Sequence, residues 1–161
     1  MIEISPIGFV TTGRKETVDD YWGDAKATIT LDVKQFSPSA IRGLDTFSHI
    51  EVIFSFNLVK DEDVLTGESH PRGNPEWPKM GIFAQRKKDR PNKIGVSICK
   101  LESIDQLKIH VLGLDAVEGT PILDIKPVMT GFLPNRNDIR EPEWAKTLMC
   151  AYYKNESERQ S

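Results

Sequence analysis

TITLDV, residues 28–33, places apolar side chains at every second position, which is the period of a half-buried β-strand. The same alternation recurs in IGVSI at residues 94–98 and in LKIHV at residues 107–111. Because Glu102–Gln106 lie between these two segments, we expect a β-hairpin there. Residues 50–56, IEVIFSF, are more uniformly apolar, which favours a strand buried on both faces. Several short strands without alternating helices predict a mainly β domain, a barrel or a sandwich.

The length and composition are those of one compact domain. The chain has 161 residues, of which 39% are hydrophobic and 28% charged, so we expect a single domain over residues 1–161. The first residues lack the pattern of a signal peptide, and no window approaches the roughly 18 apolar residues of a membrane span. We therefore expect a cytoplasmic protein without a membrane segment. Cys99 and Cys150 are too few for a disulfide framework or a thiolate metal cage, and we interpret both as buried packing residues.

Charge is distributed unevenly along the chain. Residues 72–100 hold eight basic residues against Glu76 and Asp89, a local charge of +6 within a chain of net charge −3. The rest of the chain therefore carries −9. Such a patch can attract a polyanion to one face, and the alternative is a loop of solvated lysines.

Two further segments differ from the strands. Residues 59–79 are rich in acidic residues, glycine and lysine, and three prolines make regular structure improbable, so we expect a long loop that acts as a lid or binds a partner. Towards the end, Pro142 is suited to the first turn of a helix. Trp144, Leu148 and Tyr152 would then share one face, within a helical C-terminal extension over residues 131–161.

Several common enzyme motifs are missing. The sequence has neither the G-x-G-x-x-G of a dinucleotide-binding strand and turn nor a P-loop, so a Rossmann-type methyltransferase is disfavoured. Three histidines without an H-E-x-x-H pair, and without a cysteine cluster, leave little basis for a metal site. No G-x-S-x-G turn supports a nucleophilic serine.

The most informative stretch for function is residues 80–97, MGIFAQRKKDRPNKIGVS. An apolar segment ends in a charged turn, a proline fixes the backbone, and a second strand opens with Gly95. Arg86 and Arg90 have planar donor groups that bind carboxylates or phosphates, and Asn92 offers both a donor and an acceptor. Since Gly95 lies on the face opposite Ile94, Val96 and Ile98, a ligand could approach the backbone there. The alternative is a hairpin turn whose charges face water.

Four blocks in this sequence resemble those of one protein family. Residues 81–97 follow the pattern G-[IV]-F-A-x-R-x-x-x-R-P-N-x-I-G-x-S, and Pro6-Ile7-Gly8 resembles the opening strand. Residues 41–50, IRGLDTFSHI, and residues 114–127, LDAVEGTPILDIKP, resemble the other two blocks. Together the blocks resemble the TsaA-like (TrmO) methyltransferases over about residues 5–130.

The resemblance implies a small closed antiparallel β-barrel with a few short helices, not a Rossmann fold. It also implies a homodimer that binds S-adenosyl-L-methionine near the subunit interface and methylates tRNA, at the N6 atom of a threonylcarbamoyl-adenosine beside the anticodon. Family positions and the donor chemistry of the charged turn together give the expected cofactor residues: Tyr21, Asn57, Leu58, Arg86, Arg90, Asn92, Val96, Asp115, Ala116, Val117 and Glu118, with Asp19 and Asp20 beside Tyr21.

The chain departs from the family pattern at several places. Gln85 stands where threonine is common, Lys93 where proline is usual, and Val128 where an aromatic residue is frequent. The extra C-terminal domain of longer bacterial members is not expected either. These departures leave two alternatives open: a methyltransferase that acts on a small molecule, and a non-catalytic S-adenosylmethionine-binding module.

Methyl transfer from a sulfonium depends mainly on positioning, and a threonylcarbamoylated N6 needs a base because it resembles an amide nitrogen. Asp115, Glu118, Asp124 and His70 have suitable chemistry, and the sequence does not rank them. The expected substrate-binding residues are basic: Arg72, Lys87, Lys88, Lys93 and Lys126. Lys126 has the alternative of a strand-end lysine that reaches solvent.

Overall fold

The computed structural model describes residues 1–160, and its centre is a closed barrel of six strands. The strand order around the barrel is β1-β2-β7-β6-β3-β8, and each strand is antiparallel to both neighbours. The barrel strands are β1 (Gly8–Thr12), β2 (Lys26–Leu31), β3 (His49–Ser55), β6 (Ile94–Asp105), β7 (Lys108–Leu112) and β8 (Pro121–Pro127). The expected small closed antiparallel barrel is therefore confirmed.

Short elements decorate the barrel. β4 (Glu68–Ser69) and β5 (Met80–Gly81) form a separate two-stranded sheet, and α1 (Glu143–Met149) is the single α-helix of the described residues. The other helical elements are 3-10 turns: Pro38–Ile41, Leu44–Thr46, Asp61–Asp63, Pro71–Gly73, Ile82–Ala84, Pro91–Lys93, Thr130–Phe132, Arg136–Asp138 and Glu156–Gln160. Within the described residues, no helix is both long and apolar enough to cross a membrane.

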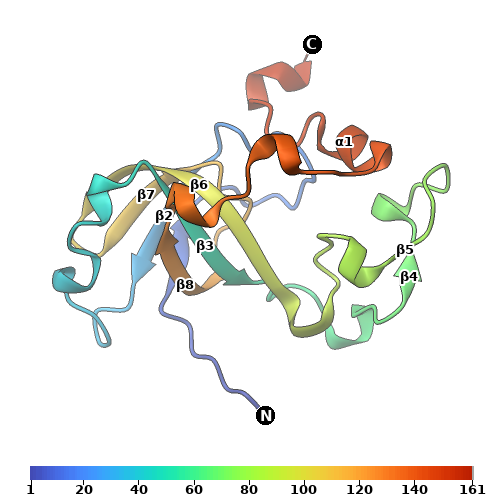
Figure 1. The fold of residues 1–161 in the computed structure, drawn as a ribbon. Helices are drawn as coiled ribbons and strands as arrows, with labels where there is room; N and C mark the ends of the chain where they lie inside the picture. Colours follow the sequence, from blue (N-terminus) through green and yellow to red (C-terminus); the bar gives the residue numbers. More distant parts are fainter. Residues whose placement is uncertain (161) are drawn as a thin grey trace.

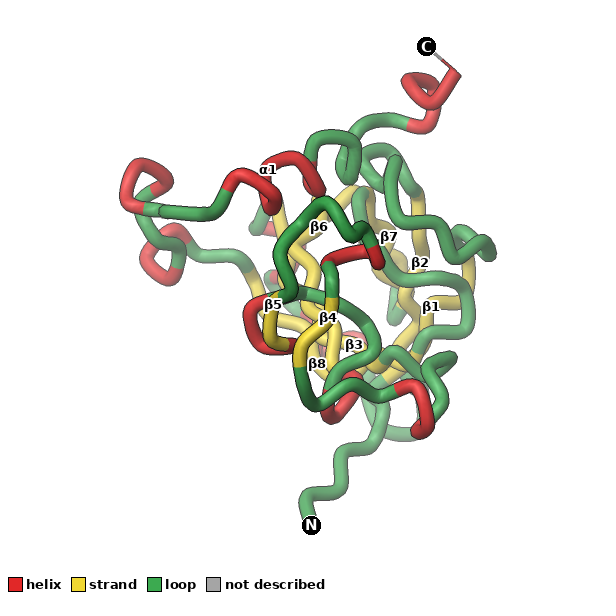
Figure 2. Tube along the Cα trace, turned by 90° about the vertical axis from the view of Figure 1, so that its right-hand side faces the viewer, coloured by secondary structure: helices red, strands yellow, loops and turns green. Residues whose placement is uncertain are grey.

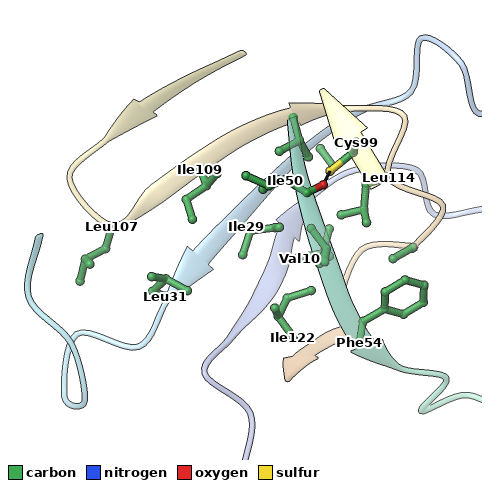
Figure 3. Packing of buried hydrophobic residues seen from close by; sticks show 14 residues of the cluster. Val10, Ile29, Leu31, Ile50, Phe54, Cys99, Leu107, Ile109, Leu114 and Ile122 are labelled. Atoms are coloured by element: carbon green, nitrogen blue, oxygen red, sulfur yellow. Dashed lines mark hydrogen bonds between the residues drawn. The ribbon is translucent and has the colours of Figure 1, made fainter. Parts of the chain in front are cut away.

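The core fills the inside of the barrel, as Figure 3 shows. Ile29 of β2 lies opposite Ile109 of β7, and both side chains are fully buried. Ile50 of β3 lies opposite Cys99 of β6, and Phe54 closes one end of the cluster. Burial of each such aliphatic side chain stabilises the fold by about 1.5–3 kcal/mol. The alternating pattern in residues 28–33 and 107–111 thus marks core strands, although β2 ends at Leu31 and Val33 beyond it is 74% exposed.

Strand β6 faces the opposite way from the prediction. Gly95, Ser97 and Cys99 point into the barrel, while Val96 is half-buried and Ile98 is 45% exposed on the outside. The reason lies on the facing strand: a Cβ atom on Gly95 would lie 2.5 Å from the ring of Phe54. The aromatic ring fills the volume that an apolar side chain of β6 would otherwise occupy. Close approach at Gly95 therefore comes from the core, and the prediction of a ligand there is wrong.

The predicted hairpin is confirmed, with a tighter turn than expected. β6 continues to Asp105 and β7 begins at Lys108, so Gln106 and Leu107 alone connect them, with Gln106 at φ 55°. The predicted strand over residues 50–56 is also present, but its outward side chains are only half-buried. β3 therefore has one core face and one outer face.

The strand directions place three connections at one end of the barrel. Because neighbouring strands alternate in direction, β1, β3 and β7 all end on the same side, and residues 13–25, 56–93 and 113–120 lead away from it. In Figure 1 the connection over residues 56–93 and α1 lie on the right, whereas the turns of residues 36–47 lie on the left. Figure 2 looks onto that right-hand side, with β4 and β5 in front of the barrel.

The C-terminal segment begins where predicted and ends earlier. Pro142 is the N-cap of α1, and the ring of Trp144 packs 6.4 Å from that of Trp77. The helix ends at Met149, so Tyr152 lies in the following turn, and the predicted three-residue helix face is wrong. Cys150 caps this helix and is exposed, contrary to the expected burial, whereas Cys99 is buried as expected.

Candidate functional site

The β7–β8 connection supplies the most unusual polar group of this end of the barrel. Tyr152 Oη donates a hydrogen bond of 2.5 Å to Asp115 Oδ2, while Asp115 Oδ1 is buried and has no hydrogen-bond partner among the described residues. Leu114 and Ala116 on either side are buried in the core and fix the backbone. A carboxylate oxygen that is shielded from water and lacks a hydrogen-bond donor costs free energy.

Burial also tunes the groups around Asp115. Desolvation, with Asp115 nearby, raises the pKa of Tyr152 well above its usual range, so its hydroxyl remains protonated and is a permanent donor. Desolvation likewise raises the pKa of Cys99 to about 12, again with a contribution from Asp115. The Cys99 thiol is therefore neutral and unreactive at physiological pH, in line with a packing role.

The rest of the β7–β8 connection is held by backbone contacts. Glu118 N donates to Arg14 O at 2.8 Å, and the exposed Glu118 carboxylate lies 3.7 Å from the ammonium of Lys15. Val117 is half-buried. This short segment, called the β7–β8 wall below, holds four of the expected cofactor residues: Asp115, Ala116, Val117 and Glu118.

The segment over residues 86–93, called the arginine turn below, is held by hydrogen bonds from its arginine side chains to main-chain carbonyl groups. Arg86 Nη2 donates to Val96 O at 2.9 Å, which connects two of the expected cofactor residues directly. Arg90 Nη1 donates to Gln85 O, also at 2.9 Å. One nitrogen of each guanidinium is used in this way. Arg86 is exposed, so its free donors face the outside.

The backbone of this turn is unusual. Asn92 adopts φ 64° and Lys93 φ 50°, both in the left-handed region that is rare for residues other than glycine. Lys93 Nζ donates to Val59 O at 2.7 Å and lies 2.5 Å from Asp61 Oδ1. The lysine that stands in place of the usual family proline therefore joins the end of the connection between β3 and β6 to its beginning. Asn57 and Leu58 lie on that connection and are exposed.

The β1–β2 connection joins the same region through an ion pair. Arg72 donates to both carboxylate oxygens of Asp20, at 2.7 and 3.1 Å, and its guanidinium lies 5.9 Å from the ring centre of Tyr152. Tyr21 follows with φ 66°, and its N–H donates to Ala151 O at 3.1 Å. Arg72, expected to bind substrate, therefore holds two parts of the chain together.

Half of the basic residues in the basic window, residues 72–100, form ion pairs with nearby acidic residues. Four of its eight basic residues form ion pairs: Arg72 with Asp20, Lys87 with Asp89 at 4.0 Å, Lys93 with Asp61, and Lys100 with Glu102 at 3.0 Å. Lys79 and Lys88 are exposed, and no ion pair of either occurs among the described residues. The effective positive charge of the surface is smaller than the sequence count of +6 implies.

Two expected site residues lie elsewhere. Asp124 and Lys126 are two residues apart on β8, where Lys126 Nζ pairs with Asp124 Oδ2 at 2.6 Å. They lie opposite Ile53 and Glu51 in the middle of the barrel wall. Asp124 also lines a hollow of about 510 Å³ with Ile7, Arg42 and Phe47, at the opposite end of the barrel. The structure therefore does not bring Asp124 and Lys126 to the other expected residues.

His70 has one ring nitrogen fixed. Its Nδ1 lies 2.6 Å from Trp77 O, and because a carbonyl only accepts, Nδ1 carries the hydrogen. In the neutral ring Nε2 is then an acceptor, which is the state that a general base requires. His70 precedes Pro71 and Arg72, so it lies on the connection that contacts Asp20 and Tyr152.

Sequence reasoning missed two residues of this region. Tyr152 was assigned to a helix face, and Tyr153 was not singled out, yet their rings pack edge to face at 4.9 Å beside Asp115. Burial, followed by the charge of Asp115, raises the pKa of Tyr153 too. The available signal was a pair of adjacent aromatic residues with polar tips just beyond a short helix.

Among the described residues, no group of three His, Cys, Asp or Glu side chains could hold a metal ion.

Comparisons with known proteins agree with this architecture. A family model described as the tRNA-methyltransferase O N-terminal domain matches residues 19–132. A solved structure of TrmO superposes with a TM-score of 0.71 at 28% identity, covering 88% of this chain and 63% of that one.

Curated relatives come from bacteria, archaea and mammals. A putative S-adenosylmethionine-dependent methyltransferase, RcsF of Pseudomonas aeruginosa, is 34% identical over 77% of this chain and 53% of its own length. The tRNA (adenine(37)-N6)-methyltransferase of Escherichia coli strain K12 is 38% identical over 56% of this chain and 40% of its own. A probable S-adenosyl-L-methionine-binding protein of Pyrococcus abyssi is 33% identical over 88% of this chain and 73% of its own.

The chain thus spans about half the length of the first two relatives, and most of the archaeal one. The family match covers the barrel from the β1–β2 connection to the turn after β8, including every connection that carries the expected cofactor residues. The family expected from the sequence blocks is confirmed. The chain belongs to the family of the tRNA-methyltransferase O N-terminal domain.

Proposed function

We propose that the protein is an S-adenosylmethionine-dependent methyltransferase that modifies tRNA at N6 of an adenine, with threonylcarbamoyl-adenosine beside the anticodon as the acceptor. One observation carries the proposal. The arginine turn and the β7–β8 wall, two sequence blocks about 20 residues apart, lie at the same end of the barrel together with the connection after β3. The names of the bacterial relatives support a methyltransferase, and that of the Escherichia coli relative supports N6 of a tRNA adenine as the acceptor.

The residues at this end fit the methyl donor. Asp115 Oδ1 is a buried acceptor without a partner, and the donor molecule offers an ammonium and ribose hydroxyls. The free guanidinium nitrogens of Arg86 suit its carboxylate, and the half-buried Val117 offers an apolar surface. S-adenosylmethionine supplies an electrophilic methyl group bound to a sulfonium. The chain's own part is to hold this group and the acceptor in line.

His70 is the residue best placed to remove the proton from N6. Its Nδ1 is fixed by Trp77 O, which leaves Nε2 as the acceptor. Asp115 Oδ2 accepts from Tyr152 and Oδ1 is assigned to the methyl donor, Glu118 lies near Lys15, and Asp124 lies on the barrel wall. His70 is therefore our first choice among the four candidates.

Unpaired basic side chains would bind the RNA. Lys79 and Lys88 extend from the connection that carries Arg86 and Arg90, so phosphates held there would bring a nucleotide to the arginine turn. Because the rest of the chain is acidic, polyanion binding is directed to this face. A tRNA substrate would place the protein in the cytoplasm.

A homodimer belongs to this proposal. Large apolar side chains are exposed on β6 and on the segment after β8: Ile98, Met129, Phe132, Leu133 and Ile139. Phe132 is 85% exposed, a costly state for a side chain of this size. A second copy of the chain would cover this surface, and residues 131–161 would be an extension of the single domain.

Labelled S-adenosylmethionine and bulk tRNA test the reaction directly. The protein is incubated with both, the tRNA is digested to nucleosides, and the label is expected in a methylated threonylcarbamoyl-adenosine. tRNA from cells that lack the threonylcarbamoyl modification serves as the matched control and should stay unlabelled. Label in an unmodified adenosine would correct the acceptor, and no label in any nucleoside would reject the tRNA reaction.

A binding protein without methyltransferase activity is the second candidate. It is favoured by the archaeal relative, which is named a probable S-adenosyl-L-methionine-binding protein and of which this chain spans 73%. Calorimetry with S-adenosylmethionine alone separates the two functions. Binding without transfer to tRNA or to small molecules of a cell extract would support this candidate over the enzyme.

A further inference from the structure

The C-terminal segment is built into the candidate site rather than attached loosely beside it. Trp22 N donates to Tyr152 O at 2.8 Å, and Gly23 N donates to Lys154 O at 3.1 Å. A Cβ atom on Gly23 would lie 2.1 Å from Tyr153 O, so the two backbones are in direct contact. Residues 151–154 therefore run along the β1–β2 connection as an ordered strip.

Side-chain contacts also hold the C-terminal segment against the β1–β2 connection. Arg14 Nη2 donates to Tyr21 O and to Glu156 Oε2, the latter at 3.2 Å, and the Arg14 guanidinium lies 4.3 Å above the ring of Trp22. Glu156 N donates to Asp24 Oδ1 at 2.9 Å. These contacts hold Tyr152 in a fixed place, so its hydroxyl group is positioned before any ligand arrives.

We infer that Tyr152 is a positioning residue of the methyl-donor site, supplied by a segment that lies outside the matched family region of residues 19–132. Its hydroxyl binds Asp115 Oδ2 and thereby orients the carboxylate, so that the buried Oδ1 is left as the acceptor for an N–H or O–H donor of the bound molecule. The inference rests on the proposed function, because it assumes that S-adenosylmethionine is the molecule bound.

The surroundings of Tyr152 fit this role. Arg72 lies over its ring and donates two hydrogen bonds to Asp20. The connection that carries Arg72 and the β1–β2 connection that carries Asp20 therefore meet beside the tyrosine. Because burial keeps the hydroxyl protonated, the hydrogen bond to Asp115 persists at any physiological pH. A tyrosine ring has few rotatable bonds, so it loses little conformational entropy when it fixes the carboxylate.

Tyr152→Phe is the decisive variant, since it keeps the ring under Arg72 and removes only the hydroxyl. We expect calorimetry to show about tenfold weaker binding of S-adenosylmethionine, equal to the loss of about one hydrogen bond. S-adenosylhomocysteine, which shares the ammonium and ribose donors, should lose affinity by the same factor. The KM for S-adenosylmethionine should rise while kcat and the KM for tRNA stay within twofold. Lys154→Ala, an exposed change on the same strip, is the matched control and should bind normally.

A double-mutant cycle separates positioning from a general loosening of the fold. Asp115→Asn keeps an acceptor for Tyr152 but removes the charge, and adding Tyr152→Phe to it should weaken binding little further. Full additivity of the two changes would overturn the inference, as would normal or tighter binding by Tyr152→Phe, which would mark the strip as a blocking element. If Tyr152→Phe fails the thermal-unfolding check, Asp115→Asn decides, because unchanged affinity there would remove Asp115 from the site. A wild-type chain that binds no S-adenosylmethionine would instead reject the proposed function, and the inference with it.

Discussion

Gly95 shows how tightly the barrel interior is filled. Phe54 and Phe56 pack edge to face at 5.2 Å, and a Cβ atom on Gly95 would lie within 2.9 Å of both rings. Since Phe54 is only 1% exposed, its ring cannot move aside into solvent. The glycine of the family block I-G-x-S is thus required here by core packing.

Gly95→Ala is therefore expected to lower the free energy of unfolding by about 1–3 kcal/mol, because overpacking strains a closed core. Denaturant titration of the variant and the wild type measures the change. Combining it with Phe54→Leu should cost less than the sum of the single changes, because the smaller side chain makes room. An unchanged unfolding midpoint for Gly95→Ala would show that the interior adjusts freely.

Arg86 is expected to bind the carboxylate of the methyl donor through the nitrogens that Val96 O leaves free. Arg86→Ala should weaken S-adenosylmethionine binding about 10- to 100-fold, since a charge-assisted pair is lost. Arg86→Lys should not restore it fully, because an ammonium lacks the planar pair of donors. Arg42→Ala, at the opposite end of the barrel, is the matched control. Equal affinity of Arg86→Ala and the wild type would place the binding site elsewhere.

His70→Asn tests the proposed base with little disturbance of its surroundings. The asparagine amide occupies the place of the Nδ1–H and can still donate to Trp77 O, but it has no counterpart of Nε2. The expected result is a kcat lower by a factor of about 10² to 10⁴, with S-adenosylmethionine affinity within twofold of the wild type. His49→Asn, an exposed residue at the start of β3, should leave kcat unchanged. Normal turnover by His70→Asn would move the role to another group.

At the scale of elements, the two-stranded sheet β4–β5 depends on one buried side chain. Gln85 is 7% exposed, and its Nε2 donates to Met80 O at 2.7 Å and to Ser69 O at 3.2 Å. This residue, which stands where the family commonly has threonine, joins both strands of the small sheet. Its place explains how a connection with three prolines keeps a defined shape.

Gln85→Ala should release the β4–β5 sheet without unfolding the barrel. Two main-chain carbonyls would lose their donor, so we expect faster amide hydrogen exchange over residues 65–90 and unchanged exchange in β2 and β7. Mass spectrometry of peptides reads both regions in one experiment. Glu76→Ala, an exposed change on the same connection, should alter neither. Faster exchange throughout the barrel would show that the small sheet is part of the global folding unit.

The strands that sequence predicts best are those with one core face and one outer face. Ile29 and Ile109 alternate with polar residues because β2 and β7 are of this kind. β6 was assigned the wrong face because its inward residues, Gly95 and Ser97, are small and its outward residues apolar. Periodicity measures which side is more apolar, and here the aromatic rings of β3 supply the missing interior volume.

The residues of the candidate site also fall into two groups: those that the sequence predicted and those that it did not. Arg86 and the wall from Asp115 to Glu118 were found because each lies in a short sequence block of the family. The contact between Tyr152 and Asp115 joins residues 37 positions apart, and no local pattern encodes it. The helical period even continued through Tyr152, although α1 ends at Met149 because the chain turns there to follow the β1–β2 connection.

At the scale of the whole molecule, the distribution of charge determines where the proposed RNA substrate would bind. The chain carries −3, and ion pairs with Asp20, Asp61 and Glu102 draw acids from outside the basic window to its edge. Of the eight basic residues in the window, those without an ion pair among the described residues extend from the connection over residues 56–93, so the positive charge that remains in the window lies at that end of the barrel. A surface of this kind favours contact with a few phosphates over indiscriminate binding.

The salt dependence of tRNA binding tests this placement. Each phosphate contact releases condensed counterions, so Lys88→Ala should lower the slope of log affinity against log salt by about 0.7–0.9 and weaken all tRNAs alike. Lys108, exposed at the start of β7 on the opposite end of the barrel, is the matched control, and Lys108→Ala should leave the slope unchanged. Filter binding or fluorescence anisotropy across a salt series measures both variants against the wild type. Equal slopes for Lys88→Ala and the wild type would mean that the RNA does not cross this surface, because a lost phosphate contact cannot leave counterion release unchanged.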